Sequence, residues 1–264
     1  MSATNSDHEA SKISLFGVDI DAVTMPQAVE EVRRWLASDG EQCKFVVTPN
    51  VDHTVMLQES QEFRDVYEDA ALILADGWPV VAASRLVGRP LPERVAGSDL
   101  VPTLFSAATE AQPMTAYLLG AMPGVAETAA ANVHKKWPNV KIVGTYSPPF
   151  GFEKDEEECD RILAMVADAK PDVLVVGLGA PKQELWVHKH HDRIQATTAL
   201  CVGATIDFLA GEKSRAPRWI QKIGMEWFHR MVTEPKRLVK RYAKDAWIFP
   251  RLVFQEWMGA RKMG

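Results

Sequence analysis

The chain has 264 residues, of which 47% are hydrophobic and 25% are charged. This balance is that of a globular protein long enough for one large α/β domain, and it excludes a disordered or fibrous chain. The net charge of −5 hides an asymmetry, because residues 212–264 carry 13 Lys and Arg against 5 Asp and Glu. Three widely spaced cysteines exclude a disulfide framework, so we expect a reducing compartment.

The first residues of the sequence predict no export signal. Residues 1–12 are polar and lack the apolar stretch of a signal peptide, and we expect them to be disordered. No apolar run in the sequence approaches the roughly 18 residues needed to cross a bilayer. A membrane-spanning protein is therefore excluded.

Short apolar runs alternate with helical segments along residues 13–211. Strands are expected at residues 13–20, 44–47, 71–75, 115–119, 140–145, 172–176 and 198–202. Helices are expected at residues 26–36, in one long segment through 56–67, at 126–133 and at 153–169. Each apolar run stops at Gly, Pro, Asn or Asp, which is typical of βαβ units. The sequence therefore predicts an α/β fold, with a Rossmann-like, mostly parallel sheet flanked by helices.

Residues 212–264 differ from the rest and predict a basic, amphipathic helical appendage. Helices are expected at residues 218–231 and 234–249, with Pro250 ending the second. Four of the eight Trp lie in this appendage. Basic residues with Trp suit an anionic membrane or phosphate groups, and a solvated face that neutralises the acidic body is an equal alternative. The expected organisation is a disordered segment (1–12), an α/β core (13–211) and the appendage (212–264).

Two glycine-rich turns follow expected strands and predict contact with phosphate. Their candidate residues are Gly120 and Gly124 in the first turn, and Gly177, Gly179, Lys182 and Gln183 in the second. Glycine allows close backbone approach, and a helix N-terminus presents free N–H groups to an anion. The alternative is a tight βα turn without a ligand, but two such turns in one sheet favour a nucleotide diphosphate. The second turn does not read GxGxxG, so the dinucleotide fingerprint is absent.

Polar residues also stand where two other strands stop. Asp76 follows the expected strand 71–75, where a partly desolvated carboxylate suits a general base. The alternative is an Asp that caps the next helix, which the spacing alone favours. Thr48 and Asn50 follow the strand 44–47 and could hold sugar hydroxyls, with helix capping by Asn50 as the alternative.

The sequence predicts no metal site. Asp19 and Asp21 have the spacing of a metal-binding DxD pair, but they follow the first short strand rather than end a central one, and Asp is common in turns. His188, His190 and His191 lack acidic or Cys partners at ligand spacing, so we expect them on a solvated helix face. The ATPase phosphate loop and the GxSxG hydrolase motif are absent. We expect neither a metal nor another cofactor.

Seven segments in one order carry a resemblance that covers nearly the whole chain. They are TPNVDH (48–53), ADGWPVV (75–81), RVAGSDL (94–100), VGLGAPKQE (176–184), GATIDFLAG (203–211), RAPRW (215–219) and GMEWFHRMVTEPKRLVKRY (224–242). Together they resemble the WecG/TagA/CpsF family of bacterial glycosyltransferases.

The resemblance implies an inverting, metal-independent transferase in cell-surface polysaccharide biosynthesis. It would move a hexose or N-acetylhexosamine (N-acetylmannosamine-type or glucose) from a UDP-sugar to a polyprenyl-diphosphate-linked sugar. The enzyme would be cytoplasmic and peripherally bound, through its appendage, to the anionic inner face of the bacterial plasma membrane. A homo-oligomer is one arrangement left open, and nucleic acid is not expected because the acidic body would repel phosphates. The alternative is a non-catalytic protein that binds a nucleotide sugar or a lipid diphosphate.

The resemblance also implies roles for individual residues. Asp76 matches the catalytic base, which would take the proton of the acceptor hydroxyl. Pocket residues around donor and acceptor are matched by Thr48, Asn50, Arg94 and Gln183, and Asp207 matches a residue near the uracil. Appendage positions that close over the active site and touch the membrane are matched by Arg230, Arg237 and Arg241. These arginines would stabilise the charge on the leaving diphosphate.

Overall fold

The computed structural model describes residues 11–38, 40, 42–213, 216–217, 220, 226–233 and 235–263. Of the segment that we expected to be disordered, residues 1–10 lie outside the described residues, and Lys12 already begins the first strand.

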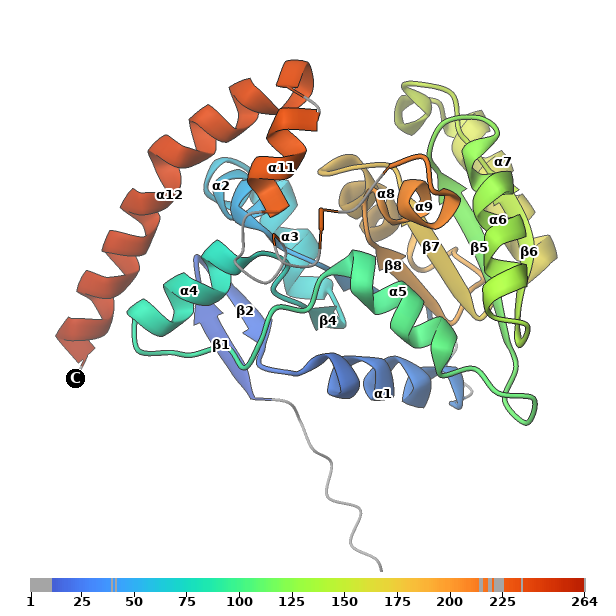
Figure 1. Ribbon diagram of the computed structural model, residues 1–264, viewed down its shortest axis with the longest axis horizontal. Coiled ribbons are helices and arrows are strands. Elements are labelled where there is room, and N and C mark those ends of the chain that lie inside the picture. The colour runs from blue at the N-terminus through green and yellow to red at the C-terminus, as the bar shows by residue number, and fades with distance from the viewer. Residues whose placement is uncertain are drawn as a thin grey trace, which may run out of the picture.

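A six-stranded parallel sheet forms the centre of the molecule (Figure 1). In spatial order its strands are β4 (Leu72–Ile73), β3 (Lys44–Val47), β8 (Thr198–Cys201), β7 (Val173–Gly177), β5 (Met114–Gly120) and β6 (Val140–Tyr146). Every neighbouring pair is parallel, so the carboxyl ends of all six strands share one edge. The predicted α/β fold class is confirmed.

Helices cover both faces of the sheet and explain why the strands are almost wholly apolar. One face packs against α2 (Val51–Glu59), α3 (Gln61–Asp69), α7 (Glu156–Ala169) and α8 (Lys182–His190). The other packs against α1 (Met25–Leu36), α5 (Gly97–Ser106), α6 (Val125–Lys136) and α9 (Thr205–Ala210). Successive strand residues point to opposite faces. Accordingly, Phe45 and Val47 lie in the first core, whereas Val46 lies in the second.

A hairpin replaces the single strand that the sequence predicted at residues 13–20. β1 (Lys12–Leu15) and β2 (Val18–Asp21) pair antiparallel around Phe16 and Gly17, whose φ angles are +58° and +83°. Two successive positive φ values give a two-residue turn whose twist matches that of the strands. The prediction was wrong because the apolar pattern continues through the turn.

The long helix expected through residues 56–67 is also interrupted, at Ser60. Ser60 Oγ accepts a hydrogen bond from the N–H of Phe63 at 3.1 Å, and so caps α3 at its N-terminus. In the same way Asp155 caps α7, which begins after a 3₁₀ turn, η1 (Phe152–Lys154). Side-chain capping therefore sets element boundaries that apolar spacing does not indicate. The structure adds α4 (Trp78–Leu86) between β4 and α5 along the chain.

The appendage contains α11 (Glu226–Thr233) and α12 (Pro235–Met263), and α12 contacts α2 (Figure 1). α12 continues through Pro250, so the predicted end of this helix was wrong. Contacts on both sides of Pro250 hold the helix to the hairpin. The Phe249 ring lies 5.4 Å from that of Phe16, and Glu256 Oε1 accepts from the Phe16 N–H at 2.8 Å. None of the helices within the described residues has both the length and the apolar character needed to cross a bilayer.

Candidate active site

The loops at the carboxyl edge of the sheet bring together most of the predicted site residues. Ligands of parallel α/β sheets bind at this edge. Two backbone hydrogen bonds join the segments around Asp76: its N–H donates to Pro49 O at 2.8 Å, and the N–H of Val95 donates to Ala75 O at 2.9 Å. These bonds place Asp76 between the loop after β3 and the segment that carries Arg94.

Arg94 lies among three carboxylates. Its guanidinium is 3.8 Å from Asp76 Oδ1, 2.9 Å from Asp99 Oδ2 and 3.1 Å from Glu226 Oε2. Asp99 belongs to α5 and Glu226 to α11, so one cation joins the loop after β4, the core and the appendage. The alternative that Asp76 caps the next helix is wrong. Gly77 is the N-cap residue of α4, and Asp76 lies one residue before it.

The structure gives Thr48 and Asn50 contacts within the protein. Thr48 is buried, and its hydroxyl donates to Cys201 O at 3.3 Å. The Asn50 side-chain oxygen accepts from the N–H groups of Asp52 and His53 at 3.0 and 3.4 Å, which caps α2. The capping alternative for Asn50 is therefore confirmed, and the loop after β3 is held rigidly against α2 and β8.

Close backbone packing explains two of the predicted phosphate-loop glycines. A Cβ atom on Gly120 would lie 2.5 Å from Gly177 O, and one on Gly177 would lie 2.9 Å from Gly203 O. Adjacent strand ends thus meet at distances that only glycine allows. Gly124 has a φ of +86° as the N-cap of α6, and Gly179 has a φ of +81°.

Lys182 and Asp207 lie at the starts of α8 and α9. Lys182 Nζ is 3.3 Å from Glu153 Oε2 and 4.7 Å from the ring centre of Phe150. Asp207, in the first turn of α9, lies 3.6 Å from Lys213 Nζ. Both charges are therefore placed at the carboxyl edge with a neighbour of opposite sign.

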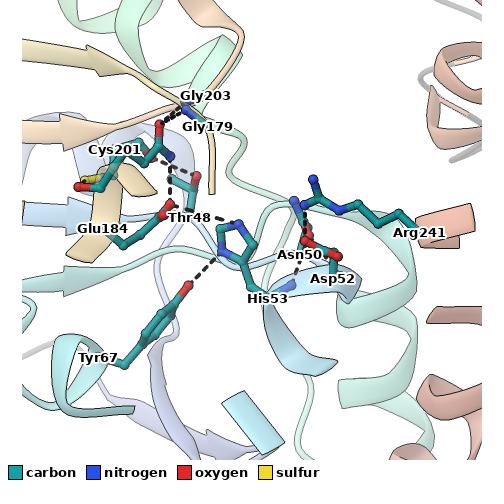
Figure 2. A network of polar contacts seen from close by, with 11 residues as sticks. Thr48, Asn50, Asp52, His53, Tyr67, Gly179, Glu184, Cys201, Gly203 and Arg241 are labelled. Carbon is teal, nitrogen blue, oxygen red and sulfur yellow. Dashed lines mark hydrogen bonds and ion pairs between the residues drawn. The ribbon is translucent and has the colours of Figure 1, made fainter. Parts of the chain in front are cut away.

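A buried polar network runs behind this edge (Figure 2). Tyr67 Oη lies 2.8 Å from His53 Nδ1, and His53 Nε2 lies 4.0 Å from Glu184 Oε1. Complete burial raises the pKa of Glu184 to about 7 and lowers the pKa of His53 to about 3. Near neutral pH the network thus holds an uncharged imidazole beside a carboxyl group that is close to its titration midpoint.

Of the three appendage arginines that were predicted to act at the site, Arg241 is the one whose side chain the structure describes. Its guanidinium forms an ion pair with Asp52 of α2 (Figure 2), and Lys244 pairs with Glu59 of the same helix at 2.7 Å. Burial raises the pKa of the neighbouring Asp245 to about 6. The side chains of Arg230 and Arg237 lie outside the described residues, so the predictions for them remain predictions.

The side chains with metal-like spacing have other partners. Asp21 accepts from the N–H of Ile73 at 2.8 Å, and His188 Nε2 lies 2.8 Å from Asp69 Oδ2. His190 is buried against Trp186, so our expectation of a solvated helix face was wrong for this residue. Among the residues that the structure describes, no three His, Cys, Asp or Glu side chains gather as metal ligands would.

A cavity of about 280 Å³ lies between α5, α6 and α9. Asp99 lines it, as do Trp137 and Thr205. A second cavity, of about 260 Å³, lies between the hairpin and α12, where Phe16, Arg89 and Glu256 line it.

Sequence reasoning missed the residues that join the core to the appendage and to the buried network. They are Asp52, His53, Tyr67, Asp99, Glu184 and Glu226. Four of them stand within the family-like segments TPNVDH, RVAGSDL and VGLGAPKQE beside residues that were predicted. An acidic or imidazole side chain inside an apolar segment was the available signal, since such groups are rarely buried unless paired.

Known proteins resemble the chain over most of its length. The family described as Glycosyl transferase WecG/TagA/CpsF matches residues 13–263. N-acetylglucosaminyldiphosphoundecaprenol N-acetyl-beta-D-mannosaminyltransferases of Staphylococcus aureus strains NCTC 8325 / PS 47 and COL are 31% identical over 228 residues, which cover 86% of this chain and 87% of theirs. The counterpart in strain MRSA252 is 30% identical over the same coverage. The chain therefore belongs to the WecG/TagA/CpsF family of glycosyltransferases, as its motifs predicted.

Proposed function

We propose that this enzyme transfers an N-acetylhexosamine, with N-acetylmannosamine as the leading candidate, from a UDP-sugar to a polyprenyl-diphosphate-linked sugar. The names of the Staphylococcus aureus relatives support this sugar and an undecaprenyl-diphosphate-linked acceptor. The observation that carries the proposal is the meeting of Asp76, Arg94 and Glu226. It places a carboxylate at the carboxyl edge of the sheet, beneath an appendage that contacts the same arginine.

Asp76 is the general base of the proposed reaction. The acceptor hydroxyl attacks the anomeric carbon from the face opposite UDP, its proton passes to Asp76, and the bond between the anomeric carbon and the diphosphate breaks. The sugar configuration is thereby inverted. Arg94 holds one oxygen of Asp76 at 3.8 Å, which orients the carboxylate toward the acceptor.

Positive charge at the carboxyl edge stabilises the departing diphosphate in this proposal. Arg230, Arg237 and Arg241 supply charge from the appendage, and the glycine-rich turns before α6 and α8 supply helix N-termini. A positioned donor of this kind contributes roughly 3 kcal/mol to transition-state stabilisation. The reaction needs no metal if these groups supply the charge. Thr48, Asn50, Lys182 and Asp207 line the donor side, where Asp207 contacts the uracil.

The appendage (212–264) is proposed as a unit that closes on the core (13–211) and touches the anionic inner face of the plasma membrane. Large apolar side chains of α12 are exposed, among them Trp247, Phe254 and Met258. Arg251 lies 4.3 Å from the Trp247 ring, and Arg261 lies 3.9 Å from the Trp257 ring. Trp and Arg together suit the headgroup region of a membrane.

UDP release tests the proposal. Purified protein is mixed with UDP-N-acetylmannosamine, UDP-N-acetylglucosamine or UDP-glucose and a short-chain polyprenyl-diphosphate-N-acetylglucosamine acceptor, with and without EDTA. We expect acceptor-dependent release from UDP-N-acetylmannosamine in both conditions. Preference for another donor would correct the sugar, and loss of release in EDTA would overturn the metal-independent step. Tight UDP binding without release from any pair would favour a binding protein.

A further inference from the structure

The Gln183 side chain is fully engaged inside the protein, although the family resemblance places this residue in the substrate pocket. Its Oε1 accepts from the N–H groups of Gly179 at 3.2 Å and Gly203 at 3.1 Å. Its Nε2 donates to Glu184 Oε1 at 2.7 Å, and the residue is only 2% exposed. The carboxamide is therefore directed into the protein, with its oxygen and its nitrogen both bonded to protein groups.

The partners of this carboxamide allow only one orientation. Two backbone N–H donors face its oxygen, and a carboxyl oxygen faces its nitrogen. Turning the group by 180° would set the NH₂ against two donors and the oxygen against the Glu184 oxygen, which loses all three hydrogen bonds. Glu184 thus fixes which end of the Gln183 carboxamide reaches the glycines.

The surroundings of Glu184 suit it to orienting the Gln183 carboxamide. It is completely buried, and its second oxygen, Oε2, finds no hydrogen-bond partner among the described residues. His53 is the imidazole nearest to it, at 4.0 Å, and Tyr67 holds that imidazole from behind. The hydrogen bond from Gln183 is therefore the direct link between this carboxyl group and the loops after β7 and β8.

We propose that Gln183 and Glu184 are positioning residues: the Gln183 carboxamide staples the loop after β7 to the loop after β8, and Glu184 orients that staple. Gly179 precedes Lys182 by three residues, and Gly203 precedes Asp207 by four. The staple therefore sets the separation of the two helix N-termini that carry these charged side chains. Its effect on catalysis rests on the proposed transferase function, whereas its effect on the loops does not.

Exchanging the two side chains tests this inference. In Gln183→Glu one carboxylate oxygen still accepts from the glycines, but the other now faces Glu184, and two ionised carboxylates repel. In the double variant Gln183→Glu/Glu184→Gln a donor and an acceptor face each other again in reversed order. Gln112→Glu, an exposed substitution with the same charge change, is the matched control.

Two readouts are used at about pH 6 and about pH 8, each relative to the native protein. Amide hydrogen exchange at Gly179 and Gly203 reports the staple directly, and kcat and KM for the donor report its effect on transfer. For Gln183→Glu we expect faster exchange at both glycines and about a tenfold lower kcat/KM at the higher pH. Both changes should weaken at the lower pH, where one carboxyl is protonated. The double variant should recover slow exchange, and activity within about threefold of native, at both pH values.

Two results would overturn the inference. One is slow exchange at both glycines in a Gln183→Leu variant, because the staple would then not hold the loops. The other is a double variant with slow exchange that remains as inactive as Gln183→Glu, because Gln183 would then act on the substrate itself. If the native protein transfers no sugar, the proposed function fails, and the exchange rates still decide whether the staple exists.

Discussion

Arg94 Nη1 lies 3.1 Å from Glu226 Oε2, which joins the core to the appendage across 132 positions of sequence. The two side chains are only 14% and 16% exposed, so this contact is screened less than a surface ion pair. Because the same guanidinium lies 3.8 Å from Asp76, its contact with the appendage bears on the electrostatics of the proposed base.

Glu226→Gln is expected to weaken closure and to leave Arg94 more strongly attracted to Asp76. We expect kcat to fall by about three- to tenfold, which is about 0.7–1.4 kcal/mol, because a Gln oxygen can still accept the hydrogen bond from Arg94 but carries no charge. Hydrogen exchange of α11 should become faster. Asp99→Asn, which removes the α5 carboxylate 2.9 Å from Arg94 and leaves Glu226 in place, is the control and should leave the exchange of α11 slow. Equal exchange of α11 in native protein and Glu226→Gln would contradict the closing role.

Asp76→Asn is expected to lower kcat by about 10²–10⁴-fold, because the Asn side chain cannot take up the proton of the attacking sugar hydroxyl. The affinity for UDP should stay within about twofold, since the substitution keeps the shape of the side chain. Isothermal titration with UDP and a UDP-release assay separate the two effects. Substantial turnover by this variant would remove Asp76 as the base.

Asp52→Asn is expected to loosen α12, because Arg241 loses the charge that holds it on α2. We expect a loss of about 1–2 kcal/mol in the free energy of α12 docking, measured from hydrogen exchange along that helix. Glu59→Gln removes the neighbouring pair with Lys244, whose side chains are about half exposed at 51% and 48%, and is the matched control. A surface pair contributes little, so its effect should stay below about 0.5 kcal/mol. Equal effects of the two substitutions would show that Asp52 is an ordinary surface partner.

The buried Glu184 is expected to make stability fall as pH rises. Its pKa is raised from the ordinary value of 4.5 to about 7 in the folded protein, so unfolding releases a proton between these values. The free energy of unfolding therefore decreases through this window, by about 3 kcal/mol in total. Glu184→Gln has no such proton, so its melting temperature should decline less between about pH 5 and about pH 8.

Other buried groups contribute to the native pH profile but are present in both proteins. The raised pKa of Asp245 acts in the same direction as that of Glu184, and the lowered pKa of His53 acts in the opposite direction. The difference between native protein and Glu184→Gln thus isolates Glu184. Parallel melting curves across the whole pH range would mean that Glu184 titrates normally.

Local signals predicted the parallel sheet well, because a strand buried on both faces is a continuous apolar run that ends at a turn residue. Five of the six central strands follow this rule, whereas in the edge strand β6 Lys141 is exposed and only Val140 is buried. The hairpin does not, since Phe16 is itself apolar and occupies the turn with a positive φ. Pro250 led to a wrong prediction of a helix end. Contacts of Phe249 and Glu256 with Phe16 hold the helix where the local sequence predicts that it stops.

The candidate site was predictable in its position and less so in its contacts. Apolar runs that stop at Thr48, Asp76 and Gly177 indicate the carboxyl edge without knowledge of any partner. The Gln183–Gly203 contact and the Arg94–Glu226 pair join distant segments, and no periodicity encodes such pairs. Only packing decides whether a polar side chain at the edge points outward to a ligand or inward, as Gln183 does.

The bond between Phe16 N–H and Glu256 spans 240 positions, and this separation bears on the order in which contacts form during synthesis. The loop between the two residues can close only after all the residues between them have been made. The hairpin is therefore synthesised well before Glu256, its partner in α12. A nascent chain that ends before Glu256 will thus carry the hairpin without this partner.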